Sequence, residues 1–274
     1  MSLIVASLNS GSNGNCYYVE DGEDAVLIDA GISCRETEIR MKRMGLSLKK
    51  VRGIFITHEH SDHIGGVAKL SKRHKLPVFI TQATRLQGRL KLDDSLCHTF
   101  KAHEPITLGH LSITPIPKLH DAVDPHSFVV SSEQVRIGFF TDTGAPCEHL
   151  ITGFSQCHAA FLEANYDEDM LEYGGYPYRL KNRIRGGHGH LSNKQALALF
   201  LQYRPAYMSH LFLAHLSNNN NTPEKVKDLF EPVAGTTEIV ITPRDKETKL
   251  YHIRASGKLF SPKTDKPQQL SLFQ

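Results

Sequence analysis

The chain has 274 residues, of which 40% are hydrophobic and 22% are charged, and its formal net charge is +3. This length suits one large domain or two small ones, the hydrophobic content is enough for a sizeable core, and the mild positive charge does not by itself predict nucleic-acid binding. No apolar run has the length of a membrane span or the flanks of a signal peptide, and the five cysteines are scattered without a C-x-x-C pair, so we expect a reduced, cytoplasmic protein with no membrane association.

The first segment of the chain predicts two strands joined by a loop of small residues. The runs 3–8 and 16–19 are short and apolar, as strands are. Between them, residues 10–15 read Ser-Gly-Ser-Asn-Gly-Asn. A hairpin connection accounts for this composition, but a glycine-rich loop also exposes backbone N–H groups to an anion. The sequence alone leaves both interpretations open.

A third strand and a helix follow this loop. The third apolar run ends at Asp29. Ser33 and Glu36 fit a capping box, so we expect a helix from there to about Met44. The next apolar run, residues 51–56, is short, rich in β-formers and bounded by polar residues, which predicts a buried strand.

Four potential metal ligands lie in the six residues after this strand, which read His58-Glu59-His60-Ser61-Asp62-His63. If the extended geometry continues, His58 and His60 project to one side and Glu59 to the other. Asp62 and His63 then lie where the chain turns into a helix, which we expect over residues 64–74. This stretch would present three imidazoles and a carboxylate to a small volume.

This set of ligands indicates a metal site. Imidazole and carboxylate suit zinc, iron or manganese, and the lack of thiolates argues against a structural zinc knuckle. Two metal ions roughly 3.5–4 Å apart can hold a hydroxide and polarise a phosphoryl or carbonyl group. The alternatives are a polar turn and a single structural metal site. Turn chemistry does not call for this composition, and a single structural site would leave the chain's other ligand candidates without a role.

The rest of the chain predicts further strands and helices. The expected strands are residues 77–80, 106–108, 111–116, 127–130, 135–140, 159–162, 207–213, 239–241 and 250–253. The expected helices are residues 84–92, which have a cationic side, residues 194–203, which follow a capping box, and a last helix that begins at Thr222-Pro223. Residues 165–185 are irregular and interleave tyrosines with lysines and arginines, a composition that suits either nucleic-acid contact or a mobile surface segment.

The H-x-H-x-D-H pattern of residues 58–63 resembles the metal-binding motif of the metallo-β-lactamase superfamily, and the resemblance extends over residues 3–255. It implies an α/β fold, the four-layer αββα sandwich, with the metals at one edge between two β-sheets. It also implies two divalent metal ions, zinc, manganese or iron. Their expected ligands are His58, His60 and His120 for one ion, Asp62, His63 and His215 for the other, and Asp142 as a bridge.

Two further points belong to this ligand set. An Asp in the place of Asp29 supports the superfamily site by orienting ligands rather than by binding metal. His103, His110 and His126 are alternatives to His120, but the phase relative to the following strand favours His120.

Four segments resemble, more narrowly, the bacterial YycJ/WalJ group of DNA exonucleases. They are residues 10–15, 141–144, 189–193 and 215–217. RNase Z and RNase J are broader relatives. Only 47 residues separate Asp142 from His190, which leaves no room for the inserted domain typical of RNase J. An obvious glycine- and proline-rich arm for clamping tRNA is also missing.

This narrower resemblance implies roles for individual residues. The residues expected to act in catalysis are Asp62 and His190, with His188 as the alternative to His190. The residues expected to bind substrate are Ser12, Asn15 and Asn221. In the expected reaction, water attacks a phosphodiester phosphorus while His190 stabilises the developing charge or protonates the leaving oxygen.

The C-terminal residues predict a flexible tail after a hydrolase domain of residues 1–260. Residues 261–267 are polar and contain two prolines, as a tether does. Residues 269–273, Gln-Leu-Ser-Leu-Phe, resemble the pentapeptide with which bacterial replication and repair proteins dock on the sliding clamp. The residues expected to bind the clamp are Gln269, Leu270, Leu272 and Phe273. The alternative is a tail whose apolar end packs on its own domain.

The sequence therefore predicts a phosphodiesterase that uses two metal ions, namely a 5′-to-3′ DNA exonuclease that acts in DNA repair or replication with the sliding clamp. A small-molecule ester, thioester or lactam hydrolase is the first alternative, because a fold does not fix a substrate. A non-catalytic module tethered to the clamp is the second, and the complete ligand set argues against it.

Overall fold

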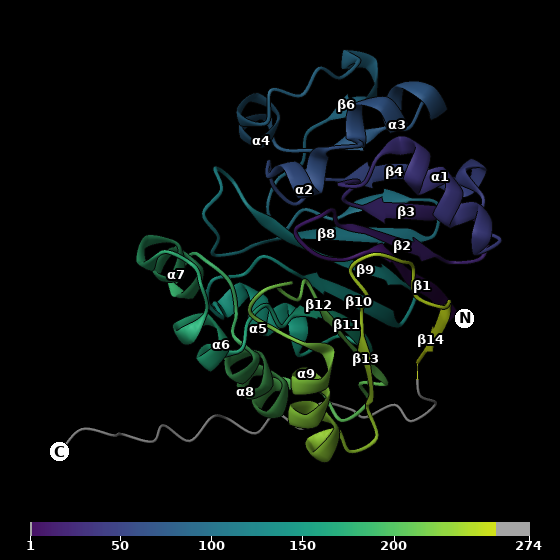
Figure 1. The fold of residues 1–274 in the computed structure, drawn as a ribbon. Coiled ribbons are helices and arrows are strands. Elements are labelled where there is room, and N and C mark those ends of the chain that lie inside the picture. Colours follow the sequence, from purple (N-terminus) through teal and green to yellow (C-terminus); the bar gives the residue numbers. More distant parts are fainter. Residues whose placement is uncertain (1, 256–274) are drawn as a thin grey trace.

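The computed structural model describes residues 2–255, and two seven-stranded β-sheets form its centre (Figure 1). The first sheet has the strand order β14 (Tyr251–Arg254), β1 (Ser2–Asn9), β2 (Cys16–Glu20), β3 (Ala25–Ile28), β4 (Val51–Phe55), β5 (Val78–Phe79) and β6 (Cys97–His98). The second sheet has the order β13 (Glu238–Ile241), β12 (His210–Ala214), β11 (Ala159–Glu163), β10 (Val135–Phe140), β9 (His126–Ser132), β8 (Leu111–Pro117) and β7 (Ile106–Leu108).

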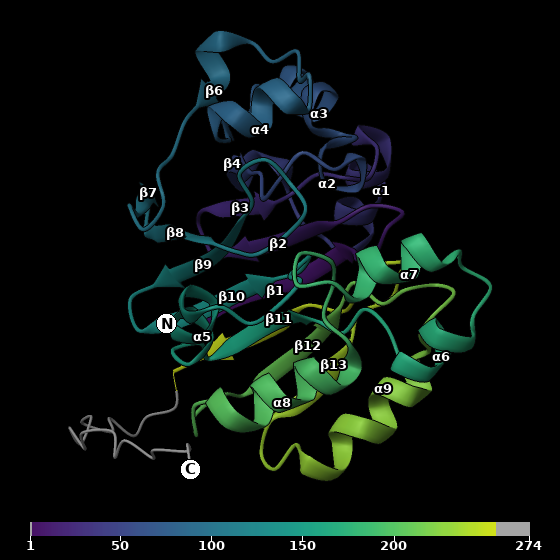
Figure 2. The same cartoon turned by 90° about the vertical axis from the view of Figure 1, so that its left-hand side faces the viewer.

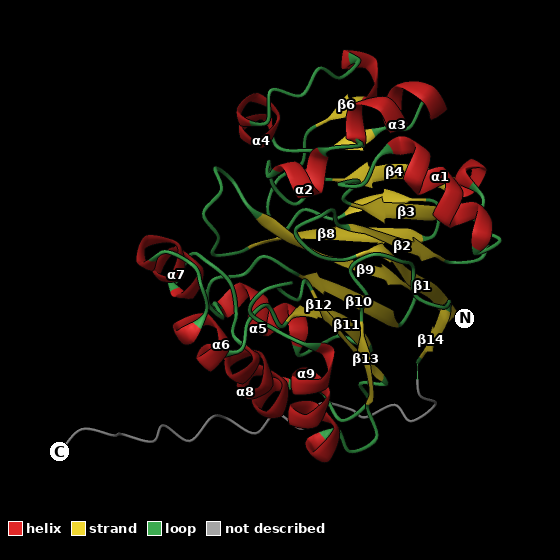
Figure 3. Cartoon of the chain, in the orientation of Figure 1, coloured by secondary structure: helices red, strands yellow, loops and turns green. Residues whose placement is uncertain are grey.

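Helices cover the outer face of each sheet (Figure 3). Those beside the first sheet are α1 (Cys34–Arg43), α2 (Ser61–Ile64), α3 (Val67–His74) and α4 (Gln82–Gln87). Those beside the second sheet are α5 (Glu148–Phe154), α6 (Glu168–Tyr173), α7 (Tyr178–Arg185), α8 (Asn193–Tyr203) and α9 (Pro223–Phe230). None of the helices in residues 2–255 is both long enough and apolar enough to cross a membrane.

Three separate hydrophobic clusters hold these layers together. The cluster between the two sheets contains Phe139, whose ring stacks on Phe161 with centroids 5.0 Å apart. Phe140, the next residue along β10, points to the opposite face and packs with Phe154 of α5 because successive strand residues alternate between faces. A third cluster lies between the first sheet and the helices α1 and α3. These layers confirm the predicted four-layer αββα sandwich (Figure 2).

Parallel pairing brings several strand ends to one edge of the sandwich. β3 and β4 pair in parallel, as do β10, β11 and β12. Their carboxyl ends lead directly into Asp29, the His58–His63 motif, Asp142, Glu163 and His215. Ligands commonly bind beyond the carboxyl ends of strands in open α/β sheets, so this edge is the place to look for a site.

The helix predicted over residues 64–74 is interrupted, which corrects the expectation of one continuous helix. α2 ends at Ile64, α3 begins at Val67, and Gly65 and Gly66 lie between them. The Gly66 N–H donates to Ala30 O over 2.8 Å, and a Cβ at Gly66 would lie 2.0 Å from a backbone oxygen. The two helices therefore break where the chain packs directly on the backbone after β3.

Residues 165–185 also differ from their expected irregular structure, because they form the short helices α6 and α7. The helix α5 had no predicted counterpart, and α4 ends at Gln87 rather than at residue 92. The tail of residues 261–274, with the expected clamp-binding residues Gln269, Leu270, Leu272 and Phe273, lies outside the described residues, as does the predicted domain boundary at residue 260.

Candidate metal centre

Three of the site residues take an unusual backbone conformation directly after a strand. Asp29, Asp142 and His215 have φ values of 59°, 53° and 57°. Non-glycine residues adopt this left-handed region rarely, and it is found more often at functional sites than elsewhere. The sharp turn at each strand end directs these three side chains back toward the edge of the sandwich.

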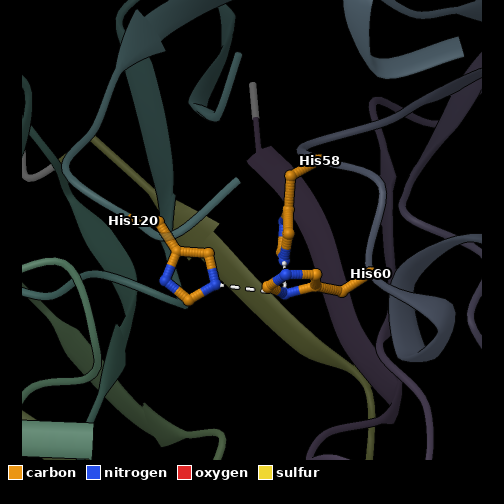
Figure 4. A group of neighbouring side chains, drawn as sticks. All are labelled: His58, His60 and His120. Atoms are coloured by element: carbon orange, nitrogen blue, oxygen red, sulfur yellow. Dashed lines mark hydrogen bonds between the residues drawn. The ribbon is translucent and has the colours of Figure 1, made fainter. Parts of the chain in front are cut away.

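Three imidazoles converge in a first cluster, shown in Figure 4. His58 Nε2 lies 3.1 Å from His60 Nδ1, and His120 Nε2 lies 3.3 Å from the same nitrogen. His58 and His120 are buried, and His60 is partly exposed. Three ring nitrogens that face one another at this distance can supply three of the four ligands of a tetrahedral metal site.

A second cluster lies beside the first. His63 Nε2 and His215 Nε2 are each 3.5 Å from Asp62 Oδ2. Asp142 joins this cluster, because its Oδ2 lies 3.1 Å from His63 Nε2 and its Oδ1 lies 3.6 Å from His215 Nε2. Asp142 Oδ1 is also 3.9 Å from His120 Nε2, so this one carboxylate reaches both clusters.

Hydrogen bonds on the far side of the rings fix which nitrogen faces the centre. Asp29 Oδ2 accepts the hydroxyl proton of Thr57 over 2.9 Å, so Thr57 Oγ1 accepts in turn from His58 Nδ1, which is 2.8 Å away. The same Asp29 oxygen lies 2.7 Å from His63 Nδ1. Because the Nδ1 atoms carry protons in these contacts, the Nε2 atoms face inward, where they present lone pairs once a metal cation displaces any second proton.

Two further inward-facing rings, those of His120 and His215, are held in the same way. His120 Nδ1 lies 3.0 Å from Gly189 O, and His215 Nδ1 lies 3.0 Å from Glu163 Oε1. Both acceptors are oxygen atoms without a proton to give, so the imidazoles donate. The orientation of His120 therefore depends on the loop before α8, which lies far away in the sequence.

Unpartnered atoms at the centre show that the residues fit metal ions. His215 Nε2 and Asp142 Oδ2 are buried and have no hydrogen-bond partner, and buried polar atoms seldom lack one. Inward-facing lone pairs and carboxylate oxygens repel one another unless a cation lies between them. Imidazoles and carboxylates together suit zinc or manganese, so the two clusters could hold two metal ions as a dinuclear site.

The ionisation of the carboxylates in the site also favours the binding of metal cations. Burial opposes the ionisation of Asp142, but the imidazoles of His215 and His63 hold the pKa of its carboxyl well below the usual value. Burial likewise opposes the ionisation of Glu163, yet His190 and His215 hold its pKa at about 2. Burial lowers the pKa of His120 to about 3, although Asp142 acts in the opposite direction. The carboxylates are therefore ionised at neutral pH, and they attract cations.

Glu163 is a site residue that the sequence analysis missed. It is fully buried at the end of β11, and its Oε1 accepts from both His190 Nδ1, at 2.7 Å, and His215 Nδ1, at 3.0 Å. Its Oε2 accepts from the Thr143 N–H over 2.7 Å. The available signal was a carboxylate directly after a fully apolar strand that predicts burial.

Lys118 is a second residue that was missed. Its side chain is buried, and its Nζ donates to the backbone oxygen of Thr141 over 2.8 Å. Thr141 directly precedes Asp142 in the chain. Burial lowers the pKa of Lys118, while the charges of Asp142 and Asp29 act in the opposite direction. Lys118 therefore places a buried amine among the carboxylates of the site.

His190 lies at the rim of the centre, and the alternative histidines do not. The His190 ring centroid is 5.4 Å from those of both His120 and His215, and 17% of its side chain is exposed. Since Nδ1 donates to Glu163, its Nε2 is the nitrogen left to face the solvent side. The alternative to His190, His188, is exposed. Of the alternatives to His120, His103 and His110 are exposed, and His126 Nδ1 faces Asp124 O.

The three residues expected to bind substrate take different positions. Ser12 is exposed on the loop between β1 and β2. Asn15 is buried, and its Nδ2 lies 3.0 Å from His63 Nε2 and 3.2 Å from Asp62 Oδ2. Asn221 is also buried, and its Nδ2 donates to Ala164 O over 2.8 Å. Contacts inside the protein therefore occupy the side chains of Asn15 and Asn221, and only Ser12 faces outward.

Comparison with known proteins relates this chain to a large family. Residues 10–188 match the sequence model of the metallo-beta-lactamase superfamily. The chain is 33% identical over 229 residues to the exodeoxyribonuclease YycJ of Bacillus anthracis, covering 82% of this chain and 86% of that protein. It is 31% identical over 224 residues to the exodeoxyribonuclease WalJ of Streptococcus pneumoniae, covering 79% and 82%.

A solved structure shares the fold. The metallo-beta-lactamase fold protein YhfI of Bacillus subtilis superimposes with a TM-score of 0.70, covering 92% of this chain and all of that one, at 16% sequence identity. At this identity the likeness concerns the fold alone.

Proposed function

Because the chain belongs to the metallo-β-lactamase superfamily and is a metal-dependent hydrolase, we propose that it is a DNA exonuclease that uses two metal ions and removes nucleotides in the 5′-to-3′ direction. Two relatives that match about four fifths of the chain are both named exodeoxyribonucleases. The observation that carries the proposal is the position of Asp142, whose carboxylate reaches both clusters of inward-facing imidazoles.

In this proposal, His58, His60 and His120 would hold one divalent ion, Asp62, His63 and His215 would hold the other, and Asp142 would be shared by both. Zinc and manganese both accept these ligands, as iron does. Ions bound there would polarise a phosphoryl group and lower the pKa of a water molecule. Asp29 and Glu163 orient the ligand imidazoles without binding metal.

His190 acts on the substrate in this proposal. Glu163 holds its Nδ1 over 2.7 Å, so its Nε2 faces the space beside the two clusters. A donor in this place stabilises charge that develops on the phosphoryl oxygens or protonates the leaving oxygen. Asp62, with 18% of its side chain exposed, would orient the attacking water.

The surroundings of the centre favour a nucleic-acid substrate over a small ester or lactam. α7 carries Arg179, Lys181, Arg183 and Arg185, and Tyr178 at its start is 72% exposed. Arg183 Nε pairs with Asp121 Oδ2 over 2.5 Å, and Asp121 directly follows His120 in the chain. This contact holds a helix with aromatic and cationic side chains beside the metal centre, and such side chains stack on bases and pair with phosphates.

The proposal extends to the sliding clamp on the evidence of the sequence. Residues 269–273 read Gln-Leu-Ser-Leu-Phe after a polar segment with prolines. An extended peptide that inserts Leu272 and Phe273 into an apolar pocket, with Gln269 beside it, would tether the enzyme to DNA. This tether would place the exonuclease in cytoplasmic DNA repair or replication.

A digestion time course tests the proposed activity. Protein loaded with zinc or with manganese meets end-labelled duplex DNA, single-stranded DNA and RNA, with 5′-phosphate or 5′-hydroxyl ends. We expect stepwise release of nucleotides from 5′ DNA ends, and its loss in His58→Ala, which removes one imidazole of the first cluster. His110→Ala is the matched control, because His110 is exposed on the turn between β7 and β8.

Two outcomes would overturn the proposal. Intact nucleic acid in every lane would move the assignment to a small-molecule hydrolase. Retained activity in the His58→Ala variant would refute the assignment of the first cluster.

A further inference from the structure

We propose that Arg244 and Ser12 form a subsite that binds a phosphate of the nucleic-acid backbone next to the scissile phosphodiester. This inference rests on the proposed nuclease function and concerns residues outside the two imidazole clusters. Arg244 follows β13, and Ser12 lies on the glycine-rich loop between β1 and β2. The two come from opposite ends of the chain and from different sheets.

Arg244 is held beside the metal centre by two hydrogen bonds. Its Nη1 donates to Leu216 O over 2.5 Å, and Leu216 directly follows His215. Its Nη2 donates to Ser12 Oγ over 3.2 Å. Its own carbonyl oxygen accepts from Asn13 Nδ2 over 2.7 Å. The guanidinium therefore lies between the glycine-rich loop and the loop that carries a predicted metal ligand.

The glycine-rich loop is shaped to admit this guanidinium. Gly11 has a φ of 143°, a conformation that L side chains rarely adopt. A Cβ at Gly11 would lie only 2.7 Å from Arg244 Nη1. A side chain in place of Gly11 would push the guanidinium away from Ser12.

The guanidinium has hydrogen-bonding capacity to spare. Arginine has five N–H donors, and within residues 2–255 only two of them find an acceptor. No carboxylate in that part of the chain is an ion-pair or hydrogen-bond partner of Arg244, although the residue is only partly exposed. A half-buried cation without a carboxylate partner is well suited to bind an anion, and the planar fork of a guanidinium matches a phosphate.

A cavity leads to this group from the solvent. It has a volume of about 580 Å³ and is lined by Leu216, Ser217, Asn218, Pro243, Arg244 and Lys246, among other residues. Lys246, which is exposed, adds a second positive charge to the lining, and Glu224 contributes one negative charge. Arg244 also contacts the backbone of Leu216, which directly follows the predicted metal ligand His215. A polyanion that reaches the metal centre can thus pass over Arg244, whereas a small ester has no group to place there.

The kinetics of Arg244→Ala on two substrates test this subsite. The substrates are single-stranded DNA and bis(p-nitrophenyl) phosphate, a small diester without a neighbouring phosphate. We expect kcat/KM on DNA to fall about 10- to 100-fold, as for the loss of charge-assisted hydrogen bonds, and to fall at least tenfold more than on the small diester. Arg52→Ala is the matched control, because Arg52 is exposed at the opposite end of β4, where it pairs with Asp24.

The salt dependence separates phosphate binding from a structural role. The slope of log(1/KM) on DNA against log salt concentration should decrease in magnitude by about 1 in Arg244→Ala. Arg244→Lys keeps the charge and loses the fork, so it should restore the slope while kcat/KM stays below that of the wild type. Ser12→Ala should show a smaller loss on DNA than Arg244→Ala.

The outcomes distinguish this inference from the proposed function. If the wild-type protein cleaves no nucleic acid, the proposed function fails first. If the wild type digests DNA and Arg244→Ala behaves like Arg52→Ala, the subsite is wrong. An equal loss on both substrates with an unchanged salt slope would show that Arg244 only holds the loop, and this result would also overturn the inference. If Arg244→Ala does not fold, the slope and the activity of Arg244→Lys decide the question.

Discussion

Glu163 Oε1 accepts a hydrogen bond from His190 Nδ1 over 2.7 Å, and the same oxygen lies 3.0 Å from His215 Nδ1. One buried carboxylate therefore orients both a predicted metal ligand and the imidazole proposed to act on the substrate. The other Glu163 oxygen accepts from the backbone N–H of Thr143, which follows Asp142. This arrangement connects the ends of β10, β11 and β12 through one side chain.

Glu163→Gln tests this positioning role. We expect kcat to fall about 10- to 100-fold with a smaller change in KM, because the amide has the size of the carboxylate but lacks its charge. The pH profile of kcat should shift, since His190 loses its ionised partner, and Glu163→Asp should restore part of the activity. Glu23→Gln, at an exposed position on the turn between β2 and β3, is the control. An unaltered pH profile would mean that Glu163 has only a structural role.

Thr57→Val tests the contact between Asp29 and the first cluster. The hydroxyl donates to Asp29 and accepts from His58, and valine keeps the shape while removing both bonds. We expect metal affinity to fall about tenfold and the free energy of unfolding to fall by about 1–2 kcal/mol. Metal content after dialysis against graded chelator measures the first effect. Thr99→Val, at an exposed site, should leave it unchanged, and equal metal content in both variants would contradict the prediction.

Removal of the metal ions should destabilise the protein. Ions that bind the folded state at a hundred times their Kd stabilise it by about 2.7 kcal/mol, which for a domain of this size corresponds to a fall in Tm of roughly 5–10 °C on chelation. Differential scanning calorimetry with and without chelator measures the shift, and adding zinc or manganese back should reverse it. His58→Ala should show a smaller shift. The same Tm with and without chelator would argue against a bound ion.

The parts of the site that the sequence predicts are those in which the ligands are neighbours in the chain. His58 to His63 are six consecutive residues after one strand, so local geometry alone brings them together. His120, Asp142 and His215 follow from the resemblance to the superfamily, whose membership the comparisons confirm. The structure brings all three to the same edge as the local motif.

The parts that the sequence does not predict depend on contacts between distant segments. Glu163 bonds to residues 27 and 52 positions later in the chain, and no local pattern records that distance. Gly65 and Gly66 break a helix because Gly66 packs on the backbone of Ala30 and Ile32, which sequence periodicity does not register. Asn15 belongs to a loop whose composition is typical of a binding loop, yet its side-chain amide faces Asp62 and His63 inside the protein.

The cysteines provide a test of the fold that does not involve the metal centre. Burial raises the pKa of the Cys157 thiol to about 12, and Cys16 is likewise fully buried. Alkylation requires the thiolate, so at about pH 9 both should resist iodoacetamide, whereas Cys147 is partly exposed and should react. Mass spectrometry of tryptic peptides gives the order of labelling. Rapid labelling of Cys157 in the native protein would contradict the packing between β10 and α5.

The C-terminal tail carries the last prediction, which concerns a partner rather than the reaction. Deletion of residues 268–274 should abolish co-elution with a bacterial sliding clamp, because Leu272 and Phe273 supply the apolar contact of the proposed peptide. The double variant Leu272→Ala, Phe273→Ala should have the same effect without a change in length, and Ser271→Ala is the matched control. All these variants should digest short DNA at the wild-type rate, since the proposed metal ligands lie between residues 58 and 215. Co-elution that survives the deletion would refute the tether, and a loss of nuclease activity would show instead that the tail contributes to the hydrolase domain.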